Sequence, residues 1–214
     1  MSNIWAIHID NLAKKISRAI GVMFRVRCFV SKNILTNLYP HILYAIPIWG
    51  NTFESYIEKL IILQKKTVRM MTFNLTFFSE MGPPVHAAPL FKRLKILNLN
   101  AVFELRVAKL FYDCIHNLAP NQFNDWFSLI SNIHSQGTRV NVADTRELDT
   151  SGNLFIPYVR TTHYGLRSTK VCGHKIWNLI PCPIKKAKSR VSFGKSFKNT
   201  LHSTKSRCDW LVIM

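Results

Sequence analysis

Acidic residues are scarce in this sequence. Its 214 residues include 29 lysines and arginines but only 11 aspartates and glutamates. Polymerases and nucleases that use two metal ions need clustered carboxylates to hold the divalent cations. No two aspartates are adjacent here, and the six are spread along the chain: Asp10, Asp113, Asp125, Asp144, Asp149 and Asp209. We therefore predict that this chain alone has no catalytic residues for metal-assisted phosphoryl transfer.

Motifs of other enzyme and metal-binding classes are also missing. Cys172, His174, Cys182 and Cys208 could be metal ligands, but they do not have the spacing of a zinc finger, knuckle or ribbon. The sequence has no Gly-x-Ser-x-Gly elbow and no phosphate-cradling Gly-x-x-x-x-Gly-Lys loop. We therefore expect no metal, no cofactor and no small-molecule substrate.

Long apolar runs and paired cysteines are lacking as well. The longest apolar run is interrupted by Pro47, and it is far shorter than the roughly 20 residues of a membrane-spanning helix. No secretory signal is evident at the N-terminus. The five cysteines are widely spaced, with no Cys-x-x-Cys pair, which is typical of a reducing compartment. These features predict an intracellular protein without a membrane partner.

Positive charge is abundant, with a formal net charge of +18 at pH 7. Basic residues release condensed counterions when they meet phosphates, so this charge predicts a polyanionic partner. We favour the RNA or DNA backbone over an anionic membrane, because the basic residues are interleaved with Trp, Tyr and His. Hydrophobic residues make up 48% of the chain, which argues against a wholly disordered protein.

The first 130 residues have the apolar periodicity of helices. The clearest helix is predicted from Ser2 to Phe29, where apolar residues recur at steps of three and four from Trp5 to Met23. Basic residues, Lys14, Arg18 and Arg25, lie on its opposite face, toward solvent or phosphate. Further helices are expected near 31–39, 51–71, 89–97, 98–117 and 123–127. The sequence thus predicts a mainly α fold, with a helical domain over residues 1–130.

The helix near 51–71 has a basic edge. Asn51 is a candidate N-cap with Glu54 three residues later, and Gly50 is expected to allow the preceding turn. At about 100° per residue, the basic side chains gather within about 120° of arc, although Ile62 lies among them: Lys59, Lys65, Lys66 and Arg69. One interpretation is a core helix with a solvated edge, and the other is an edge that contacts phosphates.

The second part of the sequence has a different composition. We predict a polar linker over residues 131–153 and a small basic subdomain over 154–214, with a final helix near Val191–His202. No acidic residue occurs between Asp149 and Asp209. A disordered basic tail is the alternative. Trp177 is a candidate for base stacking, with core packing as the competing role. The candidate contacts in this part are Arg139, Arg160, Arg167, Lys175, Trp177, Lys185 and Lys186.

An ordered series of short motifs resembles the region downstream of the catalytic palm in reverse transcriptases of non-LTR (LINE-like, jockey-type) retrotransposons. The motifs run in the same order over nearly the whole chain: His8-Ile9, Leu38-Tyr39-Pro40, Trp49-Gly50-Asn51, Leu63-Gln64-Lys65-Lys66, Pro89-Leu90-Phe91, Ile133-His134-Ser135, Lys175-Ile176-Trp177-Asn178 and Ser192-Phe193. The resemblance implies that the first part is the thumb of an RNA-directed DNA polymerase, and that the remainder is a C-terminal extension that helps to hold nucleic acid.

The resemblance implies binding rather than activity. The polymerase aspartates of that family belong to fingers and palm segments that we do not find in this sequence, so these segments are an expected partner. The passage Leu38-Tyr39-Pro40 is shorter than in relatives, which shortens the helix predicted there. The alternative is therefore a truncated, non-functional remnant of a mobile element.

Overall fold

The computed structural model describes residues 3–26, 40, 43–76, 86–127, 153–161 and 165–203. These residues are mainly helical, which confirms the predicted fold class. By their contacts they form two units, one with the described residues up to Val102 and the other with those from Phe103 onward. Some predictions lie outside the described residues: the helix at 31–39, the linker at 131–153 apart from its last residue, and the candidate contact Arg139.

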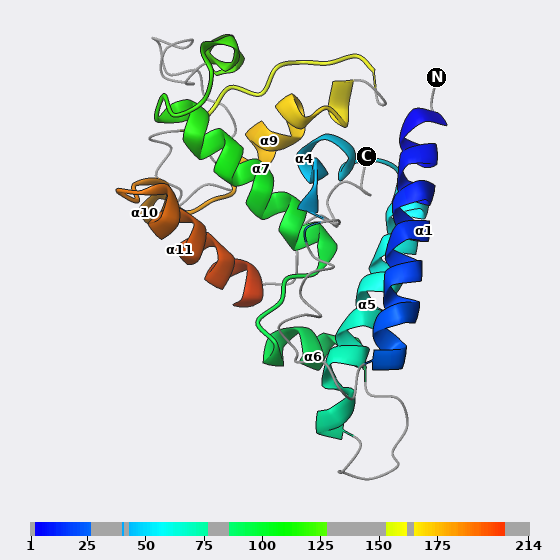
Figure 1. Cartoon of the computed structure of the whole chain (residues 1–214). Helices are drawn as coiled ribbons and strands as arrows, with labels where there is room; N and C mark the ends of the chain where they lie inside the picture. Colours follow the sequence, from blue (N-terminus) through cyan, green and yellow to red (C-terminus); the bar gives the residue numbers. More distant parts are fainter. Residues whose placement is uncertain are drawn as a thin grey trace, which may run out of the picture. The chain divides into compact units, whose positions relative to one another are not determined.

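Two long helices pack against each other in the first unit, α1 (Asn3–Val26) and α5 (Glu54–Thr76) (Figure 1). Most of the predicted apolar stripe of α1 is buried, with Ile9 at 0% exposure. Trp5 differs from the prediction, because 40% of its surface is exposed. Val68 of α5 is buried completely. The amphipathic pattern of α1 thus places its apolar face against α5 and its basic face toward solvent.

The α1 and α5 helices run in the same direction. Near their beginnings, Asp10 of α1 pairs with Lys59 of α5. Near their ends, Met23 of α1 packs against Met70 and Met71 of α5. A parallel pair needs a long connection between the two helices, and the segment before α5 supplies it.

A short helix, α4 (Ile46–Trp49), lies in this connection. Trp49 is completely buried, and its indole Nε1 donates a hydrogen bond of 2.8 Å to the carbonyl oxygen of Tyr44. The left-handed residue of this turn is Ala45, with φ of 51°, whereas Gly50 has an ordinary right-handed φ of −68°. The prediction that Gly50 provides an unusual backbone conformation was therefore wrong.

The start of α5 also differs from the prediction. The helix begins at Glu54, so Phe53 rather than Asn51 occupies the position before it, and the amides of Tyr56 and Ile57 donate to the Phe53 carbonyl. Asn51 is buried in the preceding turn. A capping residue this near a helix start is easily misplaced, because the apolar pattern fixes a helix end only to within a few residues.

Two further helices follow α5, α6 (Ala87–Arg93) and α7 (Leu99–Ile115). The α6 helix packs against α5. The Asn98 side chain caps the beginning of α7, because it accepts a hydrogen bond of 2.8 Å from the amide of Ala101. The carbonyl oxygen of Leu97 accepts a hydrogen bond of 2.9 Å from Gln64 Nε2, which ties the loop before α7 to α5.

The described residues of the second unit contain the rest of α7 together with a 3-10 helix and further α-helices. These are η2 (Asn121–Trp126), α9 (Thr169–Asn178), α10 (Cys182–Lys185) and α11 (Arg190–Ser203). The final helix agrees with the prediction of Val191–His202, whereas α9 was not predicted as a separate element. The described part of the basic C-terminal segment is therefore mainly helical from Thr169 to Ser203, whereas residues 154–161 are not helical.

Aromatic rings form the core of the second unit. Phe193 of α11 is completely buried between Tyr112 of α7 and Trp177 of α9, with ring centroids 4.7 and 5.8 Å away. Gly173 of α9 lies so close to Phe111 of α7 that an added Cβ would overlap the phenyl ring. Burial of these aromatic rings thus stabilises the unit against the repulsion between its many basic residues.

Candidate nucleic-acid interface

The basic edge of α5 faces solvent. Lys65, Lys66 and Arg69 are all exposed. Their orientation is fixed by burial of the opposite side of the helix, where Gln64 and Val68 have at most 1% of their surface exposed. Gln64, Thr67 and Val68 form the buried side of the helix, so Lys65, Lys66 and Arg69, which lie on the other side at about 100° per residue, face outward. Three basic side chains within two turns can therefore follow a phosphate backbone.

Lys59 differs from the other basic residues of this edge. Its Nζ lies 2.7 Å from Oδ1 of Asp10, and the two side chains are 52% and 45% exposed. An ion pair this exposed is worth at most about 1 kcal/mol. Asp10 thus offsets part of the charge at the beginning of α5, while Lys65, Lys66 and Arg69 make no ion pair with any residue that the structure describes.

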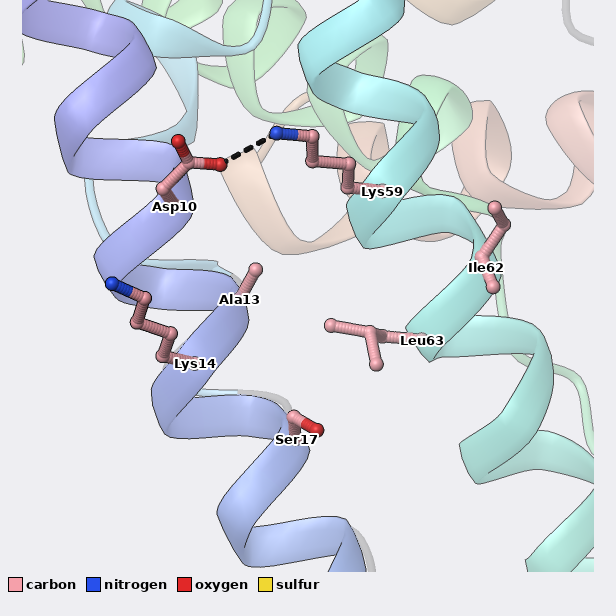
Figure 2. A pocket seen from close by; sticks show the side chains of 7 residues that line it. All are labelled: Asp10, Ala13, Lys14, Ser17, Lys59, Ile62 and Leu63. Atoms are coloured by element: carbon pink, nitrogen blue, oxygen red, sulfur yellow. Dashed lines mark hydrogen bonds and ion pairs between the residues drawn. The ribbon is translucent and has the colours of Figure 1, made fainter.

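A groove lies between α1 and α5 (Figure 2). Its volume is about 400 Å³, and it is open to solvent along one side. Ala13, Ser17 and Leu63 lie between the two helices, whereas the Asp10–Lys59 pair spans them near one end. Small side chains on α1 leave the space that makes the groove. Lys14 also lines it, so both helices bring positive charge to its edge.

The outer face of α1 extends the basic surface. Its basic residues, Lys14, Lys15, Arg18 and Arg25, are exposed. Lys14 and Lys59 line the groove, and Arg18, one helical turn after Lys14, and Lys66, two turns after Lys59, continue the basic side of each helix beyond it. The sequence pattern placed Lys14, Arg18 and Arg25 on the solvent face, but our candidate set did not include them.

The candidate contacts of the second unit fall into distinct environments. Arg160 and Lys186 are exposed, while Arg167 and Lys175 are half-buried. The Trp177 ring has 3% of its surface exposed and packs against Phe193. Of its two alternative roles, the structure therefore assigns it core packing, and no base can stack on it in this conformation.

Lys185 also has a structural role. It is 8% exposed, and its Nζ donates a hydrogen bond of 2.9 Å to Oδ1 of Asn153. The same ammonium lies 5.8 Å from the centroid of the Trp177 ring, which is a cation–π distance. Lys185 and Trp177 are therefore excluded from the surface that we consider for nucleic acid.

The cysteine and histidine residues of α9 pack as core residues. Burial raises the pKa of Cys172 to about 12, so its thiol stays protonated. His174 lies against Phe111 and Phe127, and its ring nitrogens are 2.5 and 3.0 Å from the carbonyl oxygens of Lys170 and Trp126. Burial lowers the pKa of His174. Among the described residues, no three His, Cys, Asp or Glu side chains are grouped as metal ligands.

Comparisons with models of protein families, with curated proteins and with solved structures found no match. Within the described ranges, no helix combines the length and the apolar character that crossing a bilayer requires.

Proposed function

We propose that this chain binds the sugar–phosphate backbone of RNA or DNA through the exposed basic edge of α5. The observation that carries the proposal is the group of Lys65, Lys66 and Arg69, which lie within two helical turns, face solvent and make no ion pair with the described residues. Lysine and arginine at this spacing contact successive phosphates without reading sequence.

The charge of the whole chain supports this proposal. A net charge of +18 is disfavoured by self-repulsion unless a polyanion offsets it. The basic row of α1, including Lys14 and Arg18, lies on the adjoining helix and enlarges the surface available to phosphates. A backbone contact on both helices would release more counterions than α5 alone.

We further propose that the chain is the thumb and C-terminal region of a non-LTR retrotransposon reverse transcriptase. The ordered motifs support this proposal, and two of them, Trp49-Gly50-Asn51 and Leu63-Gln64-Lys65-Lys66, lie in or before α5. The proposed role is binding of a primer–template duplex, with fingers and palm segments as a partner. No catalytic step is proposed for this chain.

Binding to a short RNA–DNA duplex over a range of salt concentrations tests the proposal. We expect the logarithm of the affinity to fall linearly with the logarithm of the salt concentration, by about 0.9 for each phosphate neutralised. Absence of binding at low salt, or an affinity that does not change with salt, would contradict it.

One observation favours a second candidate, a non-functional remnant of such an element. Large apolar side chains of α1 are exposed, with Ile7 at 58% and Val22 at 63%. A remnant would leave helix faces uncovered and would aggregate. Calorimetry distinguishes the two candidates, because a cooperative unfolding transition in a monomer counts against the remnant.

A further inference from the structure

The α7 and α11 helices of the second unit lie side by side in opposite directions (Figure 1). Near the end of α7, Oδ2 of Asp113 lies 3.0 Å from Nη2 of Arg190, at the beginning of α11. One turn earlier on α7 is Lys109, and one turn later on α11 is Gly194. We call the contact between α7 and α11 the seam. At this end of the seam, the negative charge of Asp113 neutralises the positive charge of Arg190.

Lys109 crosses the seam at Gly194. A Cβ atom at position 194 would overlap Cε of Lys109, so the aliphatic part of this lysine occupies the space that a side chain would take. Glycine in the middle of a helix costs up to about 1 kcal/mol relative to alanine. The close contact gives this glycine a packing role and holds the Lys109 ammonium at the seam.

The next positions along the seam are both basic. Arg106 precedes Lys109 by one turn of α7, and Lys198 follows Gly194 by one turn of α11. In the part of the chain that the structure describes, Arg106, Lys109 and Lys198 form no ion pair. Asp113 therefore neutralises Arg190, whereas the positive charges one turn away, at Lys109, and two turns away, at Arg106 and Lys198, have no carboxylate partner among the described residues.

The surroundings of Lys109 show the effect of this imbalance. Burial is the main cause that lowers the pKa of Lys109, followed by the positive charges of Arg106 and Arg190, with a smaller effect of Lys198. The carboxylate of Asp113 opposes them, but it already pairs with Arg190. Lys109 and Lys198 are half-buried and Arg106 is exposed, and such a cluster of like charges is stabilised when an anion binds to it.

We propose that Arg106, Lys109 and Lys198 form a binding site for a phosphate group at the α7–α11 seam. Arginine offers a planar pair of donors for two phosphate oxygens, and the lysines supply point charges. The site goes beyond the proposed function, because it lies on other helices than the α5 edge and accepts a single phosphate. That phosphate belongs either to a polynucleotide backbone or to a free phosphate ion.

The probe for the site is inorganic phosphate, titrated into the full chain while the side-chain resonances of Lys109 are followed by NMR. We expect saturable binding and an increase in the pKa of Lys109, because a nearby anion favours the charged ammonium. Resonances that do not change, or that drift without saturation, would overturn the site.

Two double variants with the same loss of charge separate a specific site from general attraction. Arg106→Gln with Lys198→Gln removes the two partners of Lys109, whereas Lys188→Gln with Lys195→Gln removes two exposed lysines outside the seam. We expect the first pair to weaken phosphate binding about tenfold and the control pair by less than about twofold. Equal weakening by both pairs would overturn the proposal.

A short single-stranded oligonucleotide identifies the source of the phosphate. If it produces the same change at Lys109 as inorganic phosphate, the site binds a polynucleotide backbone; if only the free ion does so, the site binds free phosphate. Both results support the site. Substituting Lys65, Lys66 and Arg69 leaves inorganic phosphate binding unchanged, so failure of the α5 proposal is distinguishable from failure of this one.

Discussion

The helix pairs α1–α5 and α7–α11 differ in where they place positive charge. The α5 helix directs Lys65, Lys66 and Arg69 to solvent, and the ion pair that its Lys59 makes with Asp10 of α1 is half exposed. The α7–α11 pair instead places Lys109 at the seam between its helices. Exposed basic side chains bind a row of phosphates, each weakly. A half-buried basic side chain interacts more strongly with a single phosphate, because the surrounding dielectric constant is lower.

The two units should also differ in how they respond to loss of a core residue. Phe193→Ala removes the ring between Tyr112 and Trp177, and we expect it to lower the free energy of unfolding of the second unit by about 3–5 kcal/mol. Hydrogen exchange should show faster exchange in α9 and α11, with α1 and α5 unchanged. Equal acceleration in both units would show that they unfold together.

Two glycines of the second unit give a matched test of packing. Gly173→Ala would place a Cβ against the rigid Phe111 ring, so we expect a loss of about 1–3 kcal/mol in the free energy of unfolding. Gly194→Ala meets only the flexible end of Lys109, and the higher helix propensity of alanine, worth up to about 1 kcal/mol, offsets the displacement. Chemical denaturation measures both, and equal losses would contradict the described packing.

The stability of the second unit should depend on pH through His174. Because burial lowers its pKa, the folded unit binds fewer protons than the unfolded chain just below the ordinary histidine value of 6.5. The free energy of unfolding should therefore decrease as the pH falls through this window. His174→Gln should reduce this slope, measured by denaturation at several pH values; an unchanged slope would assign the dependence to other groups.

The smallest effect is expected at the ion pair between α1 and α5. Asp10→Asn leaves Lys59 without its carboxylate, and the free energy of unfolding should fall by less than about 1 kcal/mol. Affinity for the duplex should rise, and the salt dependence should become slightly steeper, because one more basic side chain can meet a phosphate. A weaker affinity would indicate that Asp10 positions Lys59 for binding.

Local patterns in the sequence predicted much of the fold. The long periodicity of α1, the helix at α7 and the final helix α11 are each encoded within a few turns of chain. Such signals need no knowledge of distant partners. The exposed group on α5 was predicted for the same reason, since helical spacing alone places Lys65, Lys66 and Arg69 together.

Long-range contacts account for what the sequence did not predict. Asp10 and Lys59 are 49 residues apart, and Lys185 is joined to Asn153 across 32 residues. The burial of Trp177 depends on Phe193, which lies on another helix. The seam site likewise depends on the register of α7 against α11, which no single segment encodes.

The salt dependence of duplex binding by the variant Lys65→Gln, Lys66→Gln, Arg69→Gln is the most direct test of the central claim. Its matched control is Lys92→Gln, Arg93→Gln, Lys95→Gln, which removes three exposed charges elsewhere in the first unit. We predict that the α5 variant weakens binding and reduces the slope by about 2–3, while the control leaves the slope unchanged. An α5 variant with the wild-type slope, or a control with the same reduction, would contradict the claim that this edge contacts phosphates.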